Sequence, residues 1–544
     1  MKKSIVFFIA ALLGLASCSD SFLDRQYEGG MLSQEKYDQL SSDKLKSTLL
    51  GCYTMIYTMS SEDHDEFGQR SIDLWGDILS GDIAVTNKTY GWLYLDEQMS
   101  TVTGRTGTIW VFYYDMIHNI NVVINSIESG SNISQLIAEH GYPSTEEGAY
   151  EYTAEQTNYA LYLAQAKALR GYCYANLARW YTPIFTIAGY TIDNYKCVPV
   201  YTEENMTQAQ GLSTSAMVYQ RVFDDLGTAV RLFETFGARY EELNEASYAR
   251  TSKLAIDVNV ARGLLAYAYL NAAPYYSNIN ATKAKDYYRK AHQYAHDAIE
   301  SNAFRIIPNS MLYSTGFNDV SEASWMWGQN VVTETAGGLK SWFGQMDIHS
   351  YSYAWAGDTK VIDENLKNLI PAWDGRSRWF NDGSKQSAFK DCPDGKFYSA
   401  VSPNSTEKED IDREWLSDNV FMRIESMYLI AAEACYFIDS LDASKNYLTA
   451  ITDQRLNDEY PLAASDYEAY KSTLTGKQLI KEIELNWRVE MWGEGYGLQT
   501  FRRLTGTKKR GGNHDVGAGS EVKASDASFN MNIPSSEATY NPEI

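Results

Sequence analysis

Two histidines in the sequence have the spacing of a metal-binding pair. His292 and His296 are four residues apart, so on a helix they would lie on one face and could chelate zinc. Gln293 follows the first histidine, where zinc-protease helices carry the glutamate that acts as general base. A solvated helix face explains the pair better than a zinc site does. We expect no bound metal and no cofactor.

Other arrangements that could support catalysis are equally weak. His64 lies in the acidic run Glu62–Glu66, which could attract a cation but is typical of a charged loop. Gly493–Gly497 has the glycine spacing of a phosphate loop, yet it follows a helical pattern and contains Glu494. The sequence has no GxSxG elbow and no P-loop. We expect a binding protein without catalytic residues.

Aromatic residues gather where the sequence is rich in glycine and polar residues. Tyr351, Tyr353 and Trp355 alternate, so an extended segment would place three rings on one face. Trp342 lies in the same region, and Trp92 lies in a second predicted loop. Flat rings can stack on the apolar faces of sugars. We expect these five residues to form one ligand-binding platform, whereas Trp110 and Trp487, on predicted helices, belong in the core.

The composition excludes some classes of partner. The chain has 544 residues, with 47 Lys and Arg against 70 Asp and Glu, a net charge of −23. Binding along a nucleic-acid backbone requires an excess of basic residues, so nucleic acid is not an expected partner. The same charge disfavours strongly acidic polysaccharides. The 70 acids make chance carboxylate pairs unavoidable, so such pairs neither establish nor exclude a glycoside hydrolase.

The N-terminus has the pattern of a lipoprotein signal. Lys2 and Lys3 precede the apolar run Ile5–Leu15, which is too short to span a bilayer. Leu15-Ala16-Ser17-Cys18 is the sequence that lipoprotein signal peptidase cleaves before cysteine. We expect a signal peptide over residues 1–17, lipid attachment at Cys18 and a tether over residues 18–31. No later segment approaches transmembrane length.

The remaining cysteines are spaced like buried free thiols. They fit neither a CxxC pair nor a zinc framework, and their odd number argues against complete disulfide pairing. They are Cys52, Cys173, Cys197, Cys392 and Cys435.

Helical periodicity dominates most of the chain. Apolar residues recur at steps of three and four, as in the runs 161–175, 261–272, 287–298 and 424–438. Alanine fills many of the inward positions, which allows helices to approach closely. The pattern predicts an all-α fold. Its helices form either pairs similar to tetratricopeptide repeats, although the strict 34-residue register of that repeat is absent, or an unrelated set of amphipathic helices.

The middle and the end of the chain contain segments that lack this helical periodicity. We divide the chain into a helical region over residues 32–308 and a second region over 309–544, in which residues 309–419 are irregular. Gly506–Ser525 reads as a glycine-rich loop. The prolines of the tail, Pro534 and Pro542, predict an extended segment.

Four sequence marks together resemble the SusD/RagB family of lipoproteins. The first is the run Cys18–Asp24 after the signal, and the second is Ala166–Tyr174 followed by Pro183. The third is Arg423–Ala434, and the last is the ending from Asn532 to Pro542. These marks span nearly the whole mature chain in the order of the family.

The resemblance implies a fold built on four tetratricopeptide-like helix pairs with an irregular ligand-binding side. It also implies a surface-exposed, lipid-anchored protein of the outer membrane that binds glycans and passes them to a TonB-dependent (SusC-like) transporter. A peptide ligand, as for RagB-like members, is the first alternative. A helical glycoside hydrolase and a tetratricopeptide-like protein scaffold are the others.

One block departs from the family pattern. Asn486, Trp487, Gly497 and Thr500 stand where the family has further Arg, Glu and Asp residues. We therefore do not expect a strong ion-pair network around this block.

Overall fold

A computed structural model describes most of the chain. It covers residues 42–59, 63–87, 104–184, 189–244, 252–312, 316–349, 351–384, 386–397, 416–526, 529 and 531–544. The predicted signal peptide, the tether with Cys18, and Trp92 lie outside these residues.

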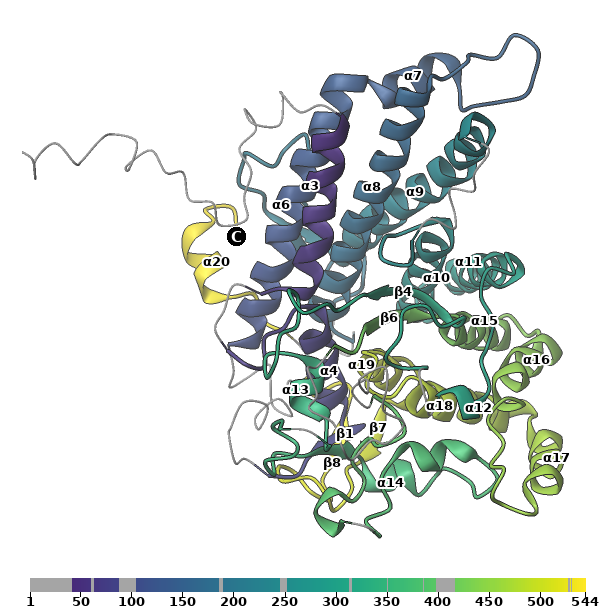
Figure 1. Cartoon of the computed structure of the whole chain (residues 1–544). Coiled ribbons are helices and arrows are strands. Elements are labelled where there is room, and N and C mark those ends of the chain that lie inside the picture. Colours follow the sequence, from purple (N-terminus) through teal and green to yellow (C-terminus); the bar gives the residue numbers. More distant parts are fainter. Residues whose placement is uncertain are drawn as a thin grey trace, which may run out of the picture.

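Long helices form the body of the molecule, as the sequence predicts. They are α3 (Ser42–Thr54), α4 (Gln69–Ser80), α6 (Arg105–Ser131), α7 (Ile133–His140), α8 (Ala154–Tyr181), α9 (Ser215–Asn244), α10 (Val258–Tyr276), α11 (Ala281–Glu300), α15 (Ile424–Phe437), α16 (Leu441–Thr452), α17 (Ala463–Thr473) and α18 (Gly476–Glu490). In Figure 1, α3, α6 and α8 stand side by side, and the later helices continue downward. Helix α8 packs on α6 and α9, α10 on α9 and α11, and α15 on α11, α16 and α18.

Small residues allow these helices to approach closely. Ala164 and Ala168 of α8 are fully buried, and so are Ala261 and Ala272 of α10. At Gly171 of α8 a Cβ atom would lie 2.7 Å from Cγ of Leu226 on α9, so only glycine fits there. The alanine-rich faces read from the sequence are therefore the helix–helix interfaces.

Arg170, next to this glycine, joins three helices through buried hydrogen bonds. Its Nε and Nη2 atoms donate to Asp225 of α9, both at 2.8 Å, and Nη1 donates to Oδ1 of Asn121 on α6 at 2.7 Å. Nη1 also pairs with Glu203 in the loop after β2 (Lys196–Pro199). The guanidinium is fully buried, so each of these acceptors offsets part of its desolvation cost.

The short strands are paired two by two and do not form a large sheet. Strand β1 (Ile83–Val85) pairs with β5 (Lys360–Ile362), β2 with β3 (Leu212–Thr214), β4 (Trp325–Gln329) with β6 (Asn419–Arg423), and β7 (Thr507–Lys509) with β8 (Glu521–Lys523), all antiparallel. The glycine-rich segment 506–525 is thus a hairpin as well as a loop.

The middle of the chain is irregular, as predicted. Besides β4 and β5, its described residues contain only short helical turns: α12 (Asn309–Leu312), α13 (Trp342–Met346), α14 (Glu364–Lys367), η5 (Gly375–Trp379) and η6 (Ser387–Phe389). Short turns also occur elsewhere, at η2 (Met55–Tyr57), α19 (Gly497–Thr500) and the π-turn η7 (Phe501–Thr505). Side chains must therefore hold this region in place.

The prediction of an extended tail is wrong for its central part. Helix α20 (Ser535–Tyr540) begins directly after Pro534, whose ψ of 137° is extended, and ends before Pro542. Both prolines lie outside the helix, where the missing N–H costs no helical hydrogen bond.

A buried ion-pair network fixes the irregular region to α18. Glu490 of α18 accepts hydrogen bonds from Arg376 at 3.2 Å, Arg423 at 3.2 Å and Arg455 at 2.9 Å. Glu494 accepts from Arg423 at 2.7 Å and from Lys396 at 2.8 Å. Our expectation of no strong network around this block is therefore wrong.

The charges of the network balance. Arg423 and Arg455 also pair with Glu425, at 3.0 and 3.1 Å, and Arg376 pairs with Asp374 at 2.6 Å. Its members are the cations Arg376, Lys396, Arg423 and Arg455 and the anions Asp374, Glu425, Glu490 and Glu494. Because cations and anions are equal in number, the network buries no net charge. Burial raises the pKa of Glu490, but the three arginines together lower it far below its ordinary value.

Removal of the central carboxylate should be strongly destabilising. We expect Glu490→Gln to cost about 3–5 kcal/mol of folding free energy, because it leaves four buried cations with only three buried carboxylates. Thermal or urea unfolding measures this loss. Glu468→Gln is the matched control, since Glu468 is 70% exposed and pairs with Lys471 on the surface. That exposed pair should contribute at most about 1 kcal/mol. Equal effects of the two substitutions would contradict a structural role for the network.

The Arg170 cluster should make stability depend on pH. Burial raises the pKa of Glu203, but Arg170 and Lys167 lower it more, from 4.5 to about 2. A carboxyl whose pKa is lower in the folded state stabilises the fold above pH 4.5, and this contribution disappears as the pH falls toward 2.

We therefore expect Glu203→Gln to lower stability by roughly 2–3 kcal/mol at pH 7. The difference from the unsubstituted protein should shrink between about pH 5 and pH 2. Urea denaturation across this range tests the expectation. A difference that stayed constant with pH would show that the ion pair with Arg170 does not carry the effect.

Candidate functional site

The glycine-rich turn at residues 493–497 binds an internal carboxylate, not a phosphate. Asp77 of α4 accepts hydrogen bonds from the backbone N–H groups of Gly495 at 3.0 Å and Gly497 at 2.8 Å. Gly495 has a φ of +81°, and a Cβ atom there would lie 2.4 Å from Oδ1 of Asp73. The turn is therefore a structural joint between α4 and the segment after α18. The sequence reading that rejected a phosphate loop agrees with this geometry.

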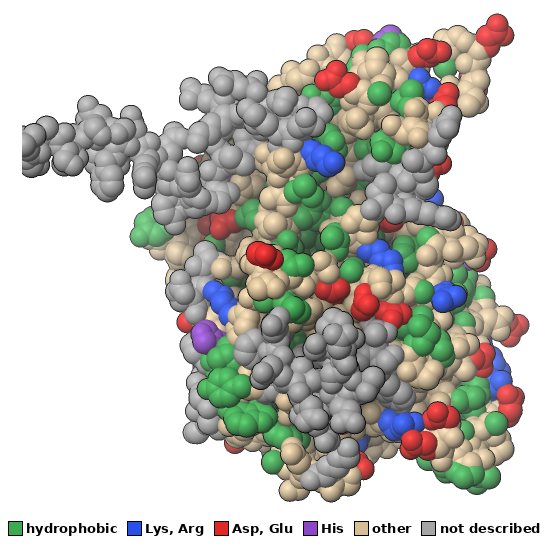
Figure 2. Space-filling model, in the orientation of Figure 1, with side chains coloured by type: hydrophobic (Ala, Val, Ile, Leu, Met, Phe, Trp, Pro, Cys, Tyr) green, Lys and Arg blue, Asp and Glu red, His purple; other side chains and the backbone are tan. Residues whose placement is uncertain are grey.

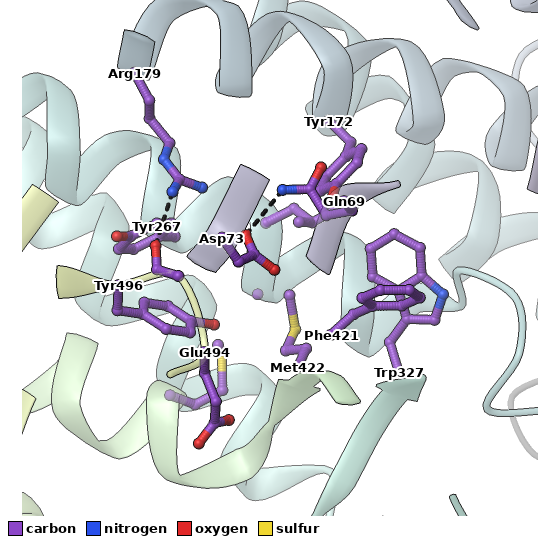
Figure 3. Close-up of a pocket in the computed structure, with 14 residues that line it drawn as sticks. Gln69, Asp73, Tyr172, Arg179, Tyr267, Trp327, Phe421, Met422, Glu494 and Tyr496 are labelled. Atoms are coloured by element: carbon purple, nitrogen blue, oxygen red, sulfur yellow. Dashed lines mark hydrogen bonds between the residues drawn. The ribbon is translucent and has the colours of Figure 1, made fainter. Parts of the chain in front are cut away.

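A small cavity lies beside this joint (Figure 3). Asp73 and Gln69 are joined by a hydrogen bond of 2.9 Å, and Arg179 donates to the carbonyl of Gly495 at 2.9 Å. The aromatic rings of Tyr267 and Trp327 line the opposite sides. The cavity measures about 50 Å³, which is room for one or two water molecules and not for a sugar ring. It is not a ligand site of that size.

Two aromatic rings stand exposed on the irregular region. Tyr351 is 64% exposed and Trp355 is 51% exposed, and their ring centroids are 5.7 Å apart at an angle of 59°. Figure 2 shows hydrophobic side chains gathered at the lower left of the molecule, where Figure 1 places the segments around α13 and β8. We call Tyr351 and Trp355 the aromatic pair. Contiguous exposed aromatic surface of this kind is a candidate for ligand contact.

Tyr353, between them in sequence, points the other way. Residues 351–357 form turns and not an extended strand, so the expected alignment of three rings on one face does not occur. Tyr353 is 9% exposed, and its hydroxyl lies 2.6 Å from Nδ1 of His64. Its backbone N–H donates to the carbonyl of Gly344 at 2.9 Å. Tyr353 therefore anchors the loop that displays the aromatic pair.

Trp342 lies in the core and contributes no exposed surface. It is 1% exposed, its ring is 5.1 Å from that of Phe397, and the guanidinium of Arg70 lies 4.1 Å from its centroid. The ring is held by this cation–π contact from α4. Sequence reasoning placed Trp342 in the platform because glycine and polar residues surround it, and the fold buries it.

A buried lysine supports the loop from below. Nζ of Lys360 donates to Oε1 of Gln345 at 3.1 Å and to the carbonyl of Asp358 at 2.9 Å. The Gln345 amide donates in turn to the carbonyl of His64 at 2.9 Å. Burial lowers the pKa of Lys360, and the Asp358 carboxylate opposes that change. These hydrogen bonds tie the loop to the segment before α4.

Strand pairing brings the end of β1 to the loop of the aromatic pair. In the β1–β5 pair, Val85 is opposite Lys360, and the side-chain amide of Asn87 donates to the carbonyl of Gly357. Asn87, shortly after β1, therefore lies beside the turn that carries Trp355. Trp92 follows a few positions later in the sequence and lies outside the described residues.

The other sequence candidates are structural. His292 and His296 both contact the hydroxyl of Tyr447, at 3.3 and 2.9 Å. Within the described part of the chain, no group of three or more His, Cys, Asp or Glu side chains is arranged to hold a metal ion. Trp110 and Trp487 are 5% and 1% exposed, which confirms their predicted burial.

The cysteines behave as predicted as well. Those in the described residues are buried and unpaired, and burial raises the pKa of Cys52 to about 12. Among the helices of the described residues, none combines the length and the apolar character needed to cross a membrane.

The fold is shared with solved structures of SusD-type proteins. A SusD-like carbohydrate binding protein from Bacteroides vulgatus superposes with a TM-score of 0.65 at 20% identity, over 93% of this chain and 97% of that one. A SusD superfamily protein from Bacteroides thetaiotaomicron gives 0.66 at 18% identity, over 93% and 99%. A structure with xylogluco-oligosaccharide gives 0.57 at 15% identity, over 91% and 97%.

Sequence comparison points to the same family. Residues 322–543 match the model of the SusD family. A SusD-like protein of Bacteroides ovatus is 23% identical over 312 residues, which are 57% of this chain and 46% of that protein. The matched stretch thus spans less than half of this curated relative. This match and the shared fold support the SusD/RagB family, in agreement with the resemblance read from the sequence marks.

Proposed function

We propose that this protein binds glycans without cleaving them, through the aromatic pair Tyr351 and Trp355. The observation that carries the proposal is the exposure of both rings, at 64% and 51%, on a loop whose backbone is fixed from inside. Flat, exposed rings stack on the apolar C–H faces of sugars. A preformed loop loses little conformational entropy when it binds.

Solved relatives of the same fold support a sugar ligand. One is described as a SusD-like carbohydrate binding protein, and another was solved with xylogluco-oligosaccharide. The net charge of −23 favours neutral over strongly acidic glycans, because the field of the whole protein repels anions at low salt. Trp92 joins the aromatic pair in this proposal, because it follows five positions after Asn87, whose side chain donates to the carbonyl of Gly357. Trp342 and Tyr353 position the loop and do not contact the ligand.

Substitution of the exposed tryptophan should weaken binding without unfolding the protein. A ring stacked on a sugar contributes about 1–2 kcal/mol, so Trp355→Ala should lower glycan affinity roughly 5- to 30-fold. Its melting temperature should stay unchanged, because the side chain is half exposed. Affinity gels or calorimetric titration with a polysaccharide panel measure the glycan affinity. Differential scanning calorimetry measures the melting temperature.

Two variants control this experiment. Trp342→Ala removes a buried ring and should cost about 3–5 kcal/mol of stability. Tyr540→Ala removes a ring that is 84% exposed on α20 and should change neither affinity nor melting. Full affinity in both Trp355→Ala and Tyr351→Ala would refute the aromatic pair as the binding surface. Binding of peptides but not glycans would favour the RagB-like alternative, and release of reducing sugar would favour a hydrolase.

We also propose that Cys18 carries a lipid anchor in the outer membrane, facing the exterior, and that the protein serves a TonB-dependent (SusC-like) transporter. The motif Leu15–Cys18 supports the anchor, and the family supports the transporter. Attachment through lipid chains is stable only when more than one chain is present, as on a lipoprotein cysteine.

This assignment predicts where the protein is recovered after cell fractionation. The unsubstituted protein should remain in the outer-membrane fraction and co-purify with a large membrane protein after detergent extraction. Cys18→Ala should be released from that fraction. Firm retention of Cys18→Ala would contradict the anchor, and repeated isolation of the unsubstituted protein alone would count against the transporter.

A further inference from the structure

A cavity on the helical half of the molecule is lined by groups that the glycan proposal does not use. It measures about 380 Å³, within the range of small-molecule sites, and we call it the α6 pocket. Its lining comes from one side of α6, from the loop after β2 and from Glu537 of α20. Figure 1 shows α20 beside α6, whereas the aromatic pair lies on the loop before β5.

Three aromatic rings form the wall of the α6 pocket. The centroids of Trp110 and Tyr114 are 4.8 Å apart, and Tyr201 lies edge-on to Tyr114 at 5.8 Å. The hydroxyl of Tyr114 donates to the carbonyl of Pro199 at 2.7 Å, which fixes that ring. The electron-rich faces and edges of such rings favour an apolar or cationic ligand over an anionic one.

Carboxylates give this wall a negative field. Asp115 and Glu537 line the α6 pocket, and none of its described lining residues is a lysine or arginine. Oε1 of Glu537 accepts a hydrogen bond from the amide of Asn541 at 3.0 Å. This amide is uncharged, so the contact does not neutralise the negative charge of Glu537. His118 also lines the pocket. Burial raises the pKa of the Asp115 carboxyl, and the nearby His118 imidazole opposes this rise.

The pocket also contains a buried donor without a partner. Asn121 is fully buried, and its Oδ1 accepts from Nη1 of Arg170 at 2.7 Å. Arginine can only donate, so this contact fixes the amide orientation and leaves Nδ2 as a donor. Nδ2 has no hydrogen-bond partner among the described residues. An unpaired buried donor costs free energy, which a ligand oxygen would recover.

We propose that the α6 pocket binds a small ligand that combines a protonated amine with hydroxyl groups, of which an unacetylated amino sugar is the matching class. The amine pairs with Asp115 and Glu537 against the aromatic wall, and a hydroxyl oxygen accepts from Asn121. This site is separate from the aromatic pair and does not depend on the glycan proposal.

Three related sugars test the charge requirement. Calorimetric titration of the full chain at pH 7 should show that glucosamine binds at least about fivefold more tightly than glucose or N-acetylglucosamine, because only glucosamine carries the cation. Asp115→Asn and Glu537→Gln should each weaken glucosamine binding, and the double variant should abolish it. Val111→Lys, at a position 51% exposed on the rim, should also weaken it through repulsion.

Matched variants keep the result specific to this pocket. Asp224→Asn removes an exposed carboxylate of α9 outside the pocket and should leave glucosamine affinity unchanged. Trp355→Ala should also leave it unchanged. Equal binding of the three sugars, or full affinity in the double variant with normal melting, would overturn the proposal. Loss of glucosamine binding in Trp355→Ala would assign the ligand to the aromatic pair, and this result would also overturn the proposal.

Discussion

The convergence of three arginines on Glu490 is the interaction on which the second half of the structure depends. Arg376 comes from the irregular region, Arg423 from the end of β6, and Arg455 from the segment after α16. Each guanidinium is buried and has a further carboxylate partner, but only Glu490 contacts all three, so it compensates part of the desolvation cost of each. One residue of α18 thereby fixes three segments that carry too little regular structure to fix themselves.

A second series of polar contacts connects this half to the exposed loop. Asp77 of α4 binds the turn after α18, and Asp82, at the end of α4, pairs with Arg488 at 2.8 Å and Lys508 at 2.7 Å. Strand β1 follows directly and pairs with β5, which continues the loop of the aromatic pair. The rings of that loop are therefore displayed by a rigid support. Rigidity matters for a weak, uncharged ligand, because ordering a mobile loop would consume the small stacking energy.

The two halves supply different chemistry. The exposed aromatic pair offers apolar surface without a strong field, which suits neutral sugar rings. The α6 pocket combines aromatic walls with carboxylates and one unsatisfied amide donor, which suits a charged and hydroxylated ligand. Their separation means that occupation of one site need not compete with the other. The net charge of −23 adds to the local negative field at the α6 pocket, and it neither attracts nor repels neutral glycans.

The helices, their alanine-rich faces, the irregular middle region and the resemblance to the SusD/RagB family could all be predicted from the amino-acid sequence, because periodicity and local motifs depend on neighbours in the chain. The exposure of individual loop residues could not be predicted in this way. Trp342 and Trp355 both lie among glycine and polar residues, yet the first is 1% exposed and the second 51%. Tyr353 lies between exposed neighbours and turns inward to His64, 289 positions earlier in the chain. Burial of a side chain in a loop depends on distant segments that cover it, and the local sequence does not predict those contacts.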